Sequence, residues 1–183
     1  MTQAAYDVIV SFSDTLAQHA DFAAIKCCYE EAKIGDWLAR LLTYLRAQPS
    51  AWVHDDLMVF DTSYELSLYI TTPTEARALN LDYRGKDYAT NILSYPADLP
   101  AEVADELPLV PLGELVICHA VVDEQAAEQG KSLAAHITHL IIHGMLHLLG
   151  FDHELGQAEQ DEMERIEIAV LADLGVANPY ELP

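Results

Sequence analysis

Basic residues are scarce in this sequence of 183 residues, which has 9 lysine and arginine residues against 30 aspartate and glutamate residues. The formal net charge of −21 argues against a protein that binds nucleic acid over a broad electropositive surface. Cysteine is also rare. Cys27, Cys28 and Cys118 form no Cys-x-x-Cys pair, which argues against a cysteine zinc site, and we interpret them as reduced thiols of a cytosolic protein.

The sequence also lacks a long uninterrupted apolar segment. The longest apolar run, Ile137 to Leu149, is broken by histidines, whereas a membrane span needs about 18 apolar residues. No basic region followed by an apolar core opens the chain, so no signal peptide is expected. With 51% hydrophobic residues and no repeat or linker, the sequence predicts a single globular domain over residues 1–183, soluble and cytoplasmic, with no membrane partner.

Hydrophobic periodicity predicts an α+β fold, in which a single mixed β-sheet of about four strands has helices packed on it. The predicted strands are Tyr6–Phe12, Glu65–Thr71, Asn91–Tyr95 (stopped by Pro96) and Leu112–Cys118. The predicted helices are Glu30–Ala47, a helix capped by Thr72 that ends near Leu81, Ala120–Gln129, Leu133–Leu149 and Gly156–Leu174. Residues 82–87 are predicted as a polar turn, and Asp98–Pro108 as an acidic loop. The helix from Leu133 is apolar nearly all round, so we expect it to be buried.

That central helix carries the most informative motif, His143 to His153 (HGMLHLLGFDH). His143 and His147 are four residues apart, so both imidazoles lie on one helical face. Gly150 ends the helix and lets the chain turn back, bringing His153 towards the other two. Three neutral imidazoles with one coordination position open describe a catalytic zinc site, so we predict one Zn²⁺ bound by these histidines.

The histidine spacing matches the zinc ligands of the metzincin proteases, but Gly144 stands where those proteases have their general-base glutamate. The metal ligands are therefore present without the peptidase base, and another hydrolysis is expected. His139 either supports the ligands or is a partly buried polar residue, and His136 has no assigned role. Asp152 can orient a ligand imidazole, although a turn residue is the favoured interpretation.

A second cluster is basic, with Arg77, Arg84 and Lys86 falling within ten residues. Arg84 and Lys86 flank Gly85, where they can face a phosphate group, and arginine can bind phosphate through two hydrogen bonds. The alternative is that they only neutralise the neighbouring carboxylates Asp82 and Asp87. Local spacing leaves both interpretations open.

Two long segments, Leu79 to Pro96 (LNLDYRGKDYATNILSYP) and His143 to His153, together resemble the bacterial YbeY family of endoribonucleases. Leu112 to Cys118 (LGELVIC) is similar to the family strand between them, and Pro179-Tyr180 resembles its C-terminal ending. The similarity covers roughly residues 63 to 180. Glu114 stands where many members have aspartate, and the strong acidity is also a departure from the family.

The resemblance implies a zinc-dependent endoribonuclease that cuts single-stranded RNA. It implies a role in ribosomal RNA maturation, at the 3′ end of the small-subunit RNA, and in ribosome quality control, with the small subunit and its assembly factors as partners and no DNA. It further implies that His143, His147 and His153 bind the zinc ion and that Arg84 contributes to catalysis. Arg84, helped by Lys86, would bind the substrate phosphate and stabilise its extra negative charge.

Two alternatives come from other classes of protein. One is a zinc peptidase, supported only by the metzincin-like spacing and disfavoured by Gly144. The other is a non-enzymatic ribosome assembly factor with a structural metal, disfavoured because structural zinc sites usually have four protein ligands. The sequence assigns no general base, since Gly144 has no side chain to serve as one.

Overall fold

The computed structural model describes residues 6–47, 63–104 and 106–181. Four strands form one sheet in the order β1-β2-β4-β3: β1 (Tyr6–Phe12), β2 (Tyr64–Thr71), β4 (Val110–Cys118) and β3 (Ile92–Pro96). β1, β2 and β4 are parallel, and β3 runs antiparallel to β4 at the edge. The predicted mixed sheet of an α+β fold is therefore confirmed.

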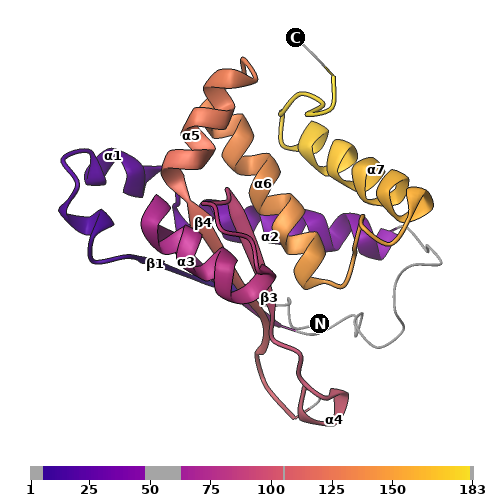
Figure 1. Cartoon of the computed structure of the whole chain (residues 1–183). Helices are drawn as coiled ribbons and strands as arrows, with labels where there is room; N and C mark the ends of the chain where they lie inside the picture. The colour runs from indigo at the N-terminus through magenta and orange to yellow at the C-terminus, as the bar shows by residue number, and fades with distance from the viewer. Residues whose placement is uncertain (1–5, 48–62, 105, 182–183) are drawn as a thin grey trace.

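Helices cover the sheet unequally. The helices are α1 (Phe22–Cys27), α2 (Glu31–Ala47), α3 (Pro73–Arg84), α4 (Ala101–Ala104), α5 (His119–Glu128), α6 (Leu133–Leu148) and α7 (Gln157–Asp173), with a 3-10 turn at Leu16–Gln18. α2 and α6 pack on one face of the sheet with α7 beside them, whereas α3 lies against the opposite face (Figure 1). α4 lies in the segment that projects away from the body between β3 and β4 (Figure 1).

The core lies between the sheet and the α2–α6 layer. Alternate residues of β2 (Leu66, Leu68 and Ile70) are fully buried on this face, opposite Leu115 and Ile117 of β4. α6 is the central helix, and ten of its residues, from His136 to Leu148, are buried. Its first turn is capped by Ser132, whose Oγ accepts a hydrogen bond from the backbone N–H of Ala135 at 3.2 Å. The burial expected from its apolar sequence is confirmed.

Gly144 lets α6 approach the sheet closely. A Cβ atom at this position would lie 2.7 Å from Cδ2 of Leu115 and 2.8 Å from Cδ1 of Ile92. Those distances are shorter than ordinary van der Waals contact, so a side chain at this position would displace the ends of the Leu115 and Ile92 side chains. Close packing on β3 and β4 accounts for the glycine, and the same packing holds the histidine-bearing face of α6 in place.

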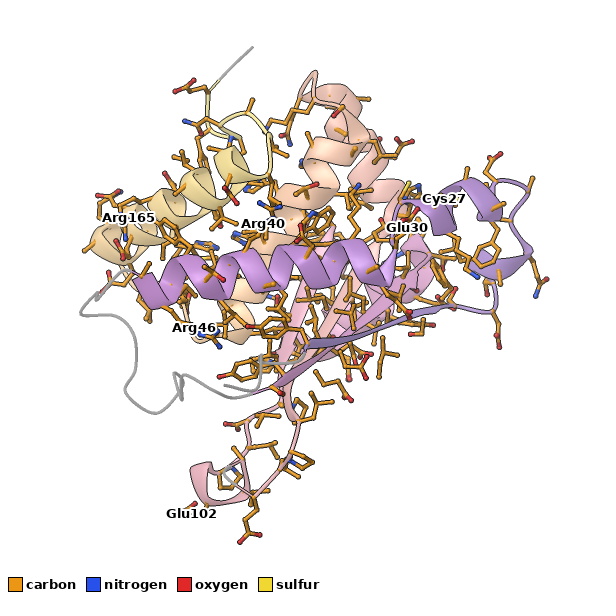
Figure 2. The ribbon with its side chains drawn as sticks, turned by 180° about the vertical axis from the view of Figure 1, so that it is seen from behind. Cys27, Glu30, Arg40, Arg46, Glu102 and Arg165 are labelled. Atoms are coloured by element: carbon orange, nitrogen blue, oxygen red, sulfur yellow. The ribbon has the colours of Figure 1, made fainter. Side chains whose placement is uncertain are left out.

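Polar contacts tie α7 to α2 on the outer side of the core. Arg40 of α2 donates a hydrogen bond to Asp173 at 2.7 Å, and Arg165 of α7 donates one to the hydroxyl of Tyr44 at 2.8 Å. Figure 2 shows α2 lying across the sheet from behind, with Arg40 on it and Arg165 on α7. These contacts help to fix the helix that faces the histidine motif.

Two local predictions are wrong. α3 does not end near Leu81 but continues to Arg84, so residues 82–84 form its last turn; Gly85 ends it with a left-handed φ of 69°. β3 ends at Pro96, which is its last residue and pairs with Gly113, because an edge strand tolerates a residue without an N–H. The predicted acidic loop contains the short helix α4.

All three cysteines are free thiols, as the sequence predicts. Cys27 is exposed, Cys28 is partly buried and Cys118 is buried. Among the described residues, none of the helices combines the length and apolar character that a membrane crossing requires.

Candidate metal centre

α6 and the turn that follows it bring three histidines together. His143 and His147 project from one face of α6, with ring centroids 4.7 Å apart and their Nε2 atoms 3.2 Å apart. His153 completes the group, with its ring centroid 5.2 Å from that of His143 and 5.1 Å from that of His147. One nitrogen from each imidazole lies within 4.8 Å of the others, and all three residues are partly buried.

The return of the chain depends on Gly150, which has a left-handed φ of 91°. The N–H groups of Gly150 and Phe151 donate to the carbonyls of His147 and Leu146, each at 3.0 Å, and so close the end of α6. Asp152 accepts a hydrogen bond from the N–H of Glu154 at 2.8 Å, which is the turn role favoured for it from sequence.

A buried carboxylate supports this cluster from behind. Glu167 of α7 has no exposed surface, and its Oε1 accepts a hydrogen bond from Nδ1 of His143 at 2.8 Å. Its Oε2 accepts from Nε2 of His139 at 3.1 Å and from the hydroxyl of Tyr180. His139 therefore lies behind His143 and against the carboxylate. His136 is buried near the start of α6, and its Nε2 lies 3.5 Å from the side-chain oxygen of Gln125.

Glu167 fixes the tautomer of His143. An ionised carboxylate only accepts hydrogen bonds, so Nδ1 of His143 donates to it, and in the neutral ring the lone pair is on Nε2, the atom that faces His147. Burial raises the pKa of Glu167, but the hydrogen bonds from His139 and His143, the attraction of His143 and the bond from Tyr180 together lower it to about 2. The carboxylate is therefore ionised at neutral pH.

His147 is also in the form that a metal requires. Burial, together with the neighbouring His143 and His153, lowers its pKa to about 4, so its imidazole is neutral at pH 7. Nitrogen atoms of three imidazoles converge on one point, and a fixed carboxylate lies on the far side of the His143 ring. This donor set fits a divalent ion of the zinc type bound by three imidazoles.

The three histidines share a cavity of about 520 Å³ with Arg84. We call it the histidine cavity; its walls come from α6, the turn after it, β3 and the last turn of α3. Arg84 is exposed, and its Nη2 donates to Oε1 of Glu154 at 2.9 Å. An arginine and a candidate metal site thus face the same space, which suits a phosphate group between them.

The other residues of the basic cluster lie outside this cavity. Lys86 is exposed and is not among the residues that line it. Arg77 donates two hydrogen bonds to Asp87, at 2.7 and 2.9 Å, and both side chains are exposed. Arg77 therefore neutralises a neighbouring carboxylate. Arg84 instead pairs with Glu154, which is 70 positions away in the sequence.

Sequence reasoning missed Glu167 and the contact of Tyr180 with it. The sequence signal that could have identified Glu167 is its spacing in α7. It lies four residues after Met163 and three before Val170, both of which are buried, so it is on the apolar face of the helix. A charged residue within the apolar face of a helix needs a buried partner. Identifying that partner required the packing of α7 against α6.

The fold and the site together define a class of protein. Three imidazoles from a buried helix and its closing turn, with an arginine across an open cavity, form the arrangement of hydrolases that hold one metal ion with a free coordination position.

Comparison with known proteins narrows this class. Residues 31–175 match the family model described as "Endoribonuclease YbeY", so the chain belongs to the YbeY endoribonuclease family. A protein named Endoribonuclease YbeY from Psychrobacter cryohalolentis is 66% identical over 115 residues, which cover 63% of this chain and 74% of that protein. One of the same name from Idiomarina loihiensis is 44% identical over 152 residues, 83% of each chain.

A solved structure is also similar in outline. The solution structure of a protein from Thermotoga maritima is 17% identical and gives a TM-score of 0.48 over 95% of this chain and 99% of that chain.

Proposed function

We propose that this chain is a zinc-dependent endoribonuclease that cuts single-stranded RNA in the cytoplasm. Its proposed role is the maturation of ribosomal RNA, at the 3′ end of the small-subunit RNA, and ribosome quality control, with the small subunit and its assembly factors as partners. Membership of the YbeY family supports the RNA substrate. The observation that carries the proposal is the convergence of three imidazoles beside Arg84 in one cavity.

Each residue has a distinct proposed task. His143, His147 and His153 hold the metal ion, which when bound would supply Lewis-acid activation of water and phosphate. Glu167 keeps the proton of His143 on Nδ1, which leaves Nε2 as a ligand atom. Arg84 binds the substrate phosphate and stabilises the negative charge that develops on it. Before it does so, Arg84 exchanges its contact with Glu154 for the phosphate.

Fewer observations support a role for Lys86 in substrate binding. It remains proposed as an outer contact for the RNA backbone, where an exposed lysine adds a screened attraction. The peptidase alternative requires a glutamate at position 144, where this chain has a glycine that packs closely against Leu115 and Ile92. The missing general base disfavours peptidase chemistry.

Paired measurements on one variant test the function. We expect His147→Ala to lose bound zinc, measured by elemental analysis of the purified protein, and to lose cleavage of a labelled single-stranded RNA. His19→Ala is the matched control, because His19 is exposed and contacts Asp21 instead of the cluster. A duplex of the same sequence should resist the wild-type enzyme. Full cleavage by a zinc-free His147→Ala protein would remove the metal from the reaction.

A further inference from the structure

A second cavity lies beside the histidine cavity, on the sheet face that carries α3. It has a volume of about 510 Å³ and is lined by three tyrosines and two carboxylates, with two aliphatic side chains between them. The tyrosines are Tyr69 of β2, Tyr83 of α3 and Tyr95 of β3, and the carboxylates are Asp82 and Glu114. We call this space the tyrosine cavity.

Tyr83 connects the two cavities because it lines both of them. It is 52% exposed, although it is a large aromatic residue, and its ring centroid lies 4.3 Å from that of Tyr95. Tyr83 also directly precedes Arg84 in the last turn of α3. An RNA strand whose phosphate contacts Arg84 therefore passes next to the exposed ring of Tyr83. The ring of Tyr95 packs against one side of Tyr83.

Charge decides what this second cavity can take. Asp82 and Glu114 repel phosphate, and the chain as a whole carries a net charge of −21, so electrostatic attraction contributes little to RNA binding. A nucleobase is neutral and stacks on aromatic rings whatever its sequence, which contributes substantially to the binding of single strands. RNA binding by an acidic enzyme must therefore depend on such neutral contacts more than RNA binding by an ordinary, basic protein does.

The two carboxylates add a preference among bases. Ionised carboxylates only accept hydrogen bonds, and the exocyclic amino groups of cytosine and adenine donate them, whereas uracil presents a carbonyl at that position. Glu114 is exposed on β4 and is paired in register with Tyr95 of β3, so its carboxylate lies on the same face as the tyrosines. An amino-bearing base stacked on Tyr83 has an acceptor within the same cavity.

We propose that Tyr83, supported by Tyr95, stacks an unpaired nucleobase of the RNA strand and that Asp82 and Glu114 favour a base with an exocyclic amino group. The tyrosine cavity is thus a base subsite next to the cleavage site. This inference rests on the proposed ribonuclease function, because it assumes that the strand lies in the histidine cavity.

The test compares Tyr83→Ala with Tyr88→Ala. Tyr88 is a matched control because it is 54% exposed and lines neither cavity. Binding of fluorescein-labelled oligocytidine and oligouridine to the zinc-loaded protein is followed by fluorescence anisotropy in the cold, and gels verify that the RNA stays intact. We expect Tyr83→Ala to weaken oligocytidine binding by about 5- to 150-fold, the worth of one base–aromatic stack, while Tyr88→Ala does not.

Salt separates stacking from charge. Stacking releases no counterions, so Tyr83→Ala should leave the slope of log affinity against log salt unchanged, and Tyr83→Trp should restore binding. Replacing both carboxylates (Asp82→Asn with Glu114→Gln) should abolish the preference for cytidine over uridine. Equal affinities for Tyr83→Ala and Tyr88→Ala would overturn the subsite, and equal wild-type binding of the two RNAs would overturn the role of the carboxylates.

Failure of the proposed function gives a different result. If the wild-type protein holds zinc but neither binds nor cuts single-stranded RNA, the ribonuclease proposal fails and the subsite fails with it. If the wild-type protein binds and cuts RNA and Tyr83→Ala behaves in the same way, only the subsite is wrong. Tyr83 is exposed, so its replacement is not expected to unfold the protein, and circular dichroism checks this.

Discussion

Oε1 of Glu167 lies 2.8 Å from Nδ1 of His143, and the carboxylate has no exposed surface. Its described hydrogen-bond donors (His143, His139 and the hydroxyl of Tyr180) are neutral groups when the histidines are unprotonated. A buried anion with only neutral partners is costly. A cation held by His143, His147 and His153 would compensate this charge through the ring of His143, so the carboxylate and the metal should stabilise each other.

Glu167→Gln tests this coupling. The amide keeps the size of the side chain but removes the negative charge, so we expect zinc affinity to fall by about 10- to 100-fold. Competition with a chromophoric chelator measures the affinity without reference to catalysis. Asp161→Asn, on the same helix α7, is the control, since Asp161 is exposed and accepts from Gln157. Equal zinc affinities for the two variants would show that the contact of Glu167 with His143 is only structural.

Tyr180→Phe tests the contribution of the C-terminal segment. The change removes the hydroxyl that donates to Glu167 and leaves the ring, while Lys131 still holds the carbonyl of Pro179 at 2.7 Å. One hydrogen bond to a charged group is worth about 1.5–3 kcal/mol, so we expect a smaller unfolding free energy, measured in urea, and a weaker zinc affinity than in the wild type. In a protein that already carries Glu167→Gln, Tyr180→Phe should cause no further loss of zinc affinity. If Tyr180→Phe weakens zinc binding equally with and without Glu167→Gln, the hydroxyl does not act through Glu167.

Arg84→Ala should reduce catalysis while zinc stays bound. Arginine is proposed to stabilise the charge that develops on the phosphate, and removal of one such donor typically lowers kcat by about 100- to 1000-fold. Arg77→Ala is the matched control, because Arg77 belongs to the same helix but pairs with Asp87 at the surface. Single-turnover cleavage of a labelled RNA and zinc content are measured together. Similar rates for the two variants would exclude Arg84 from the reaction.

Acid should destabilise the protein through His136. Burial, with the charges of His139 and Lys131, lowers the pKa of His136 to about 4, whereas the unfolded chain has a value of about 6.5. Between these values the unfolded state binds more protons, so stability falls as pH falls from about 6.5 to 4, by about 3 kcal/mol in total. Below pH 4 both states are protonated and this contribution causes no further loss.

His136→Gln isolates that contribution. Urea unfolding of the zinc-free protein in a chelator, at pH 7 and at pH 4.5, should show a smaller acid-induced loss of stability in the variant than in the wild type. His19→Gln, at an exposed position, should keep the wild-type loss. An identical pH dependence for His136→Gln and the wild type would mean that His136 takes up its proton at the same pH in the folded and unfolded states.

Local sequence signals identified the strands, the buried helix α6 and the turn that returns His153, because each depends on residues close in the chain. The end of α3 was mispredicted because polar residues in its last turn resemble a loop, and only the left-handed backbone of Gly85 ends the helix. Glu167 was missed because its partners lie 24 and 28 residues away and meet it only when α7 packs on α6. The tyrosine cavity likewise joins four separate elements of the fold, β2, α3, β3 and β4.

Gly144 provides the last prediction, through a comparison with Gly35. Both are helical glycines, but a Cβ at Gly35 would lie 3.7 Å from Val8, an ordinary contact, whereas one at Gly144 would overlap Leu115 and Ile92. Alanine should stabilise α2 at position 35 by about 1 kcal/mol through helix propensity. At position 144 the same gain is opposed by overpacking of about 1–3 kcal/mol, so the two variants should differ by that amount in urea unfolding. The overlap also pushes α6 away from β3 and β4, so Gly144→Ala, unlike Gly35→Ala, should weaken zinc binding by displacing His143 and His147. Equal stabilities for the two alanine variants would mean that the core can absorb a methyl group at Gly144, and that close packing is not what keeps a side chain from this position.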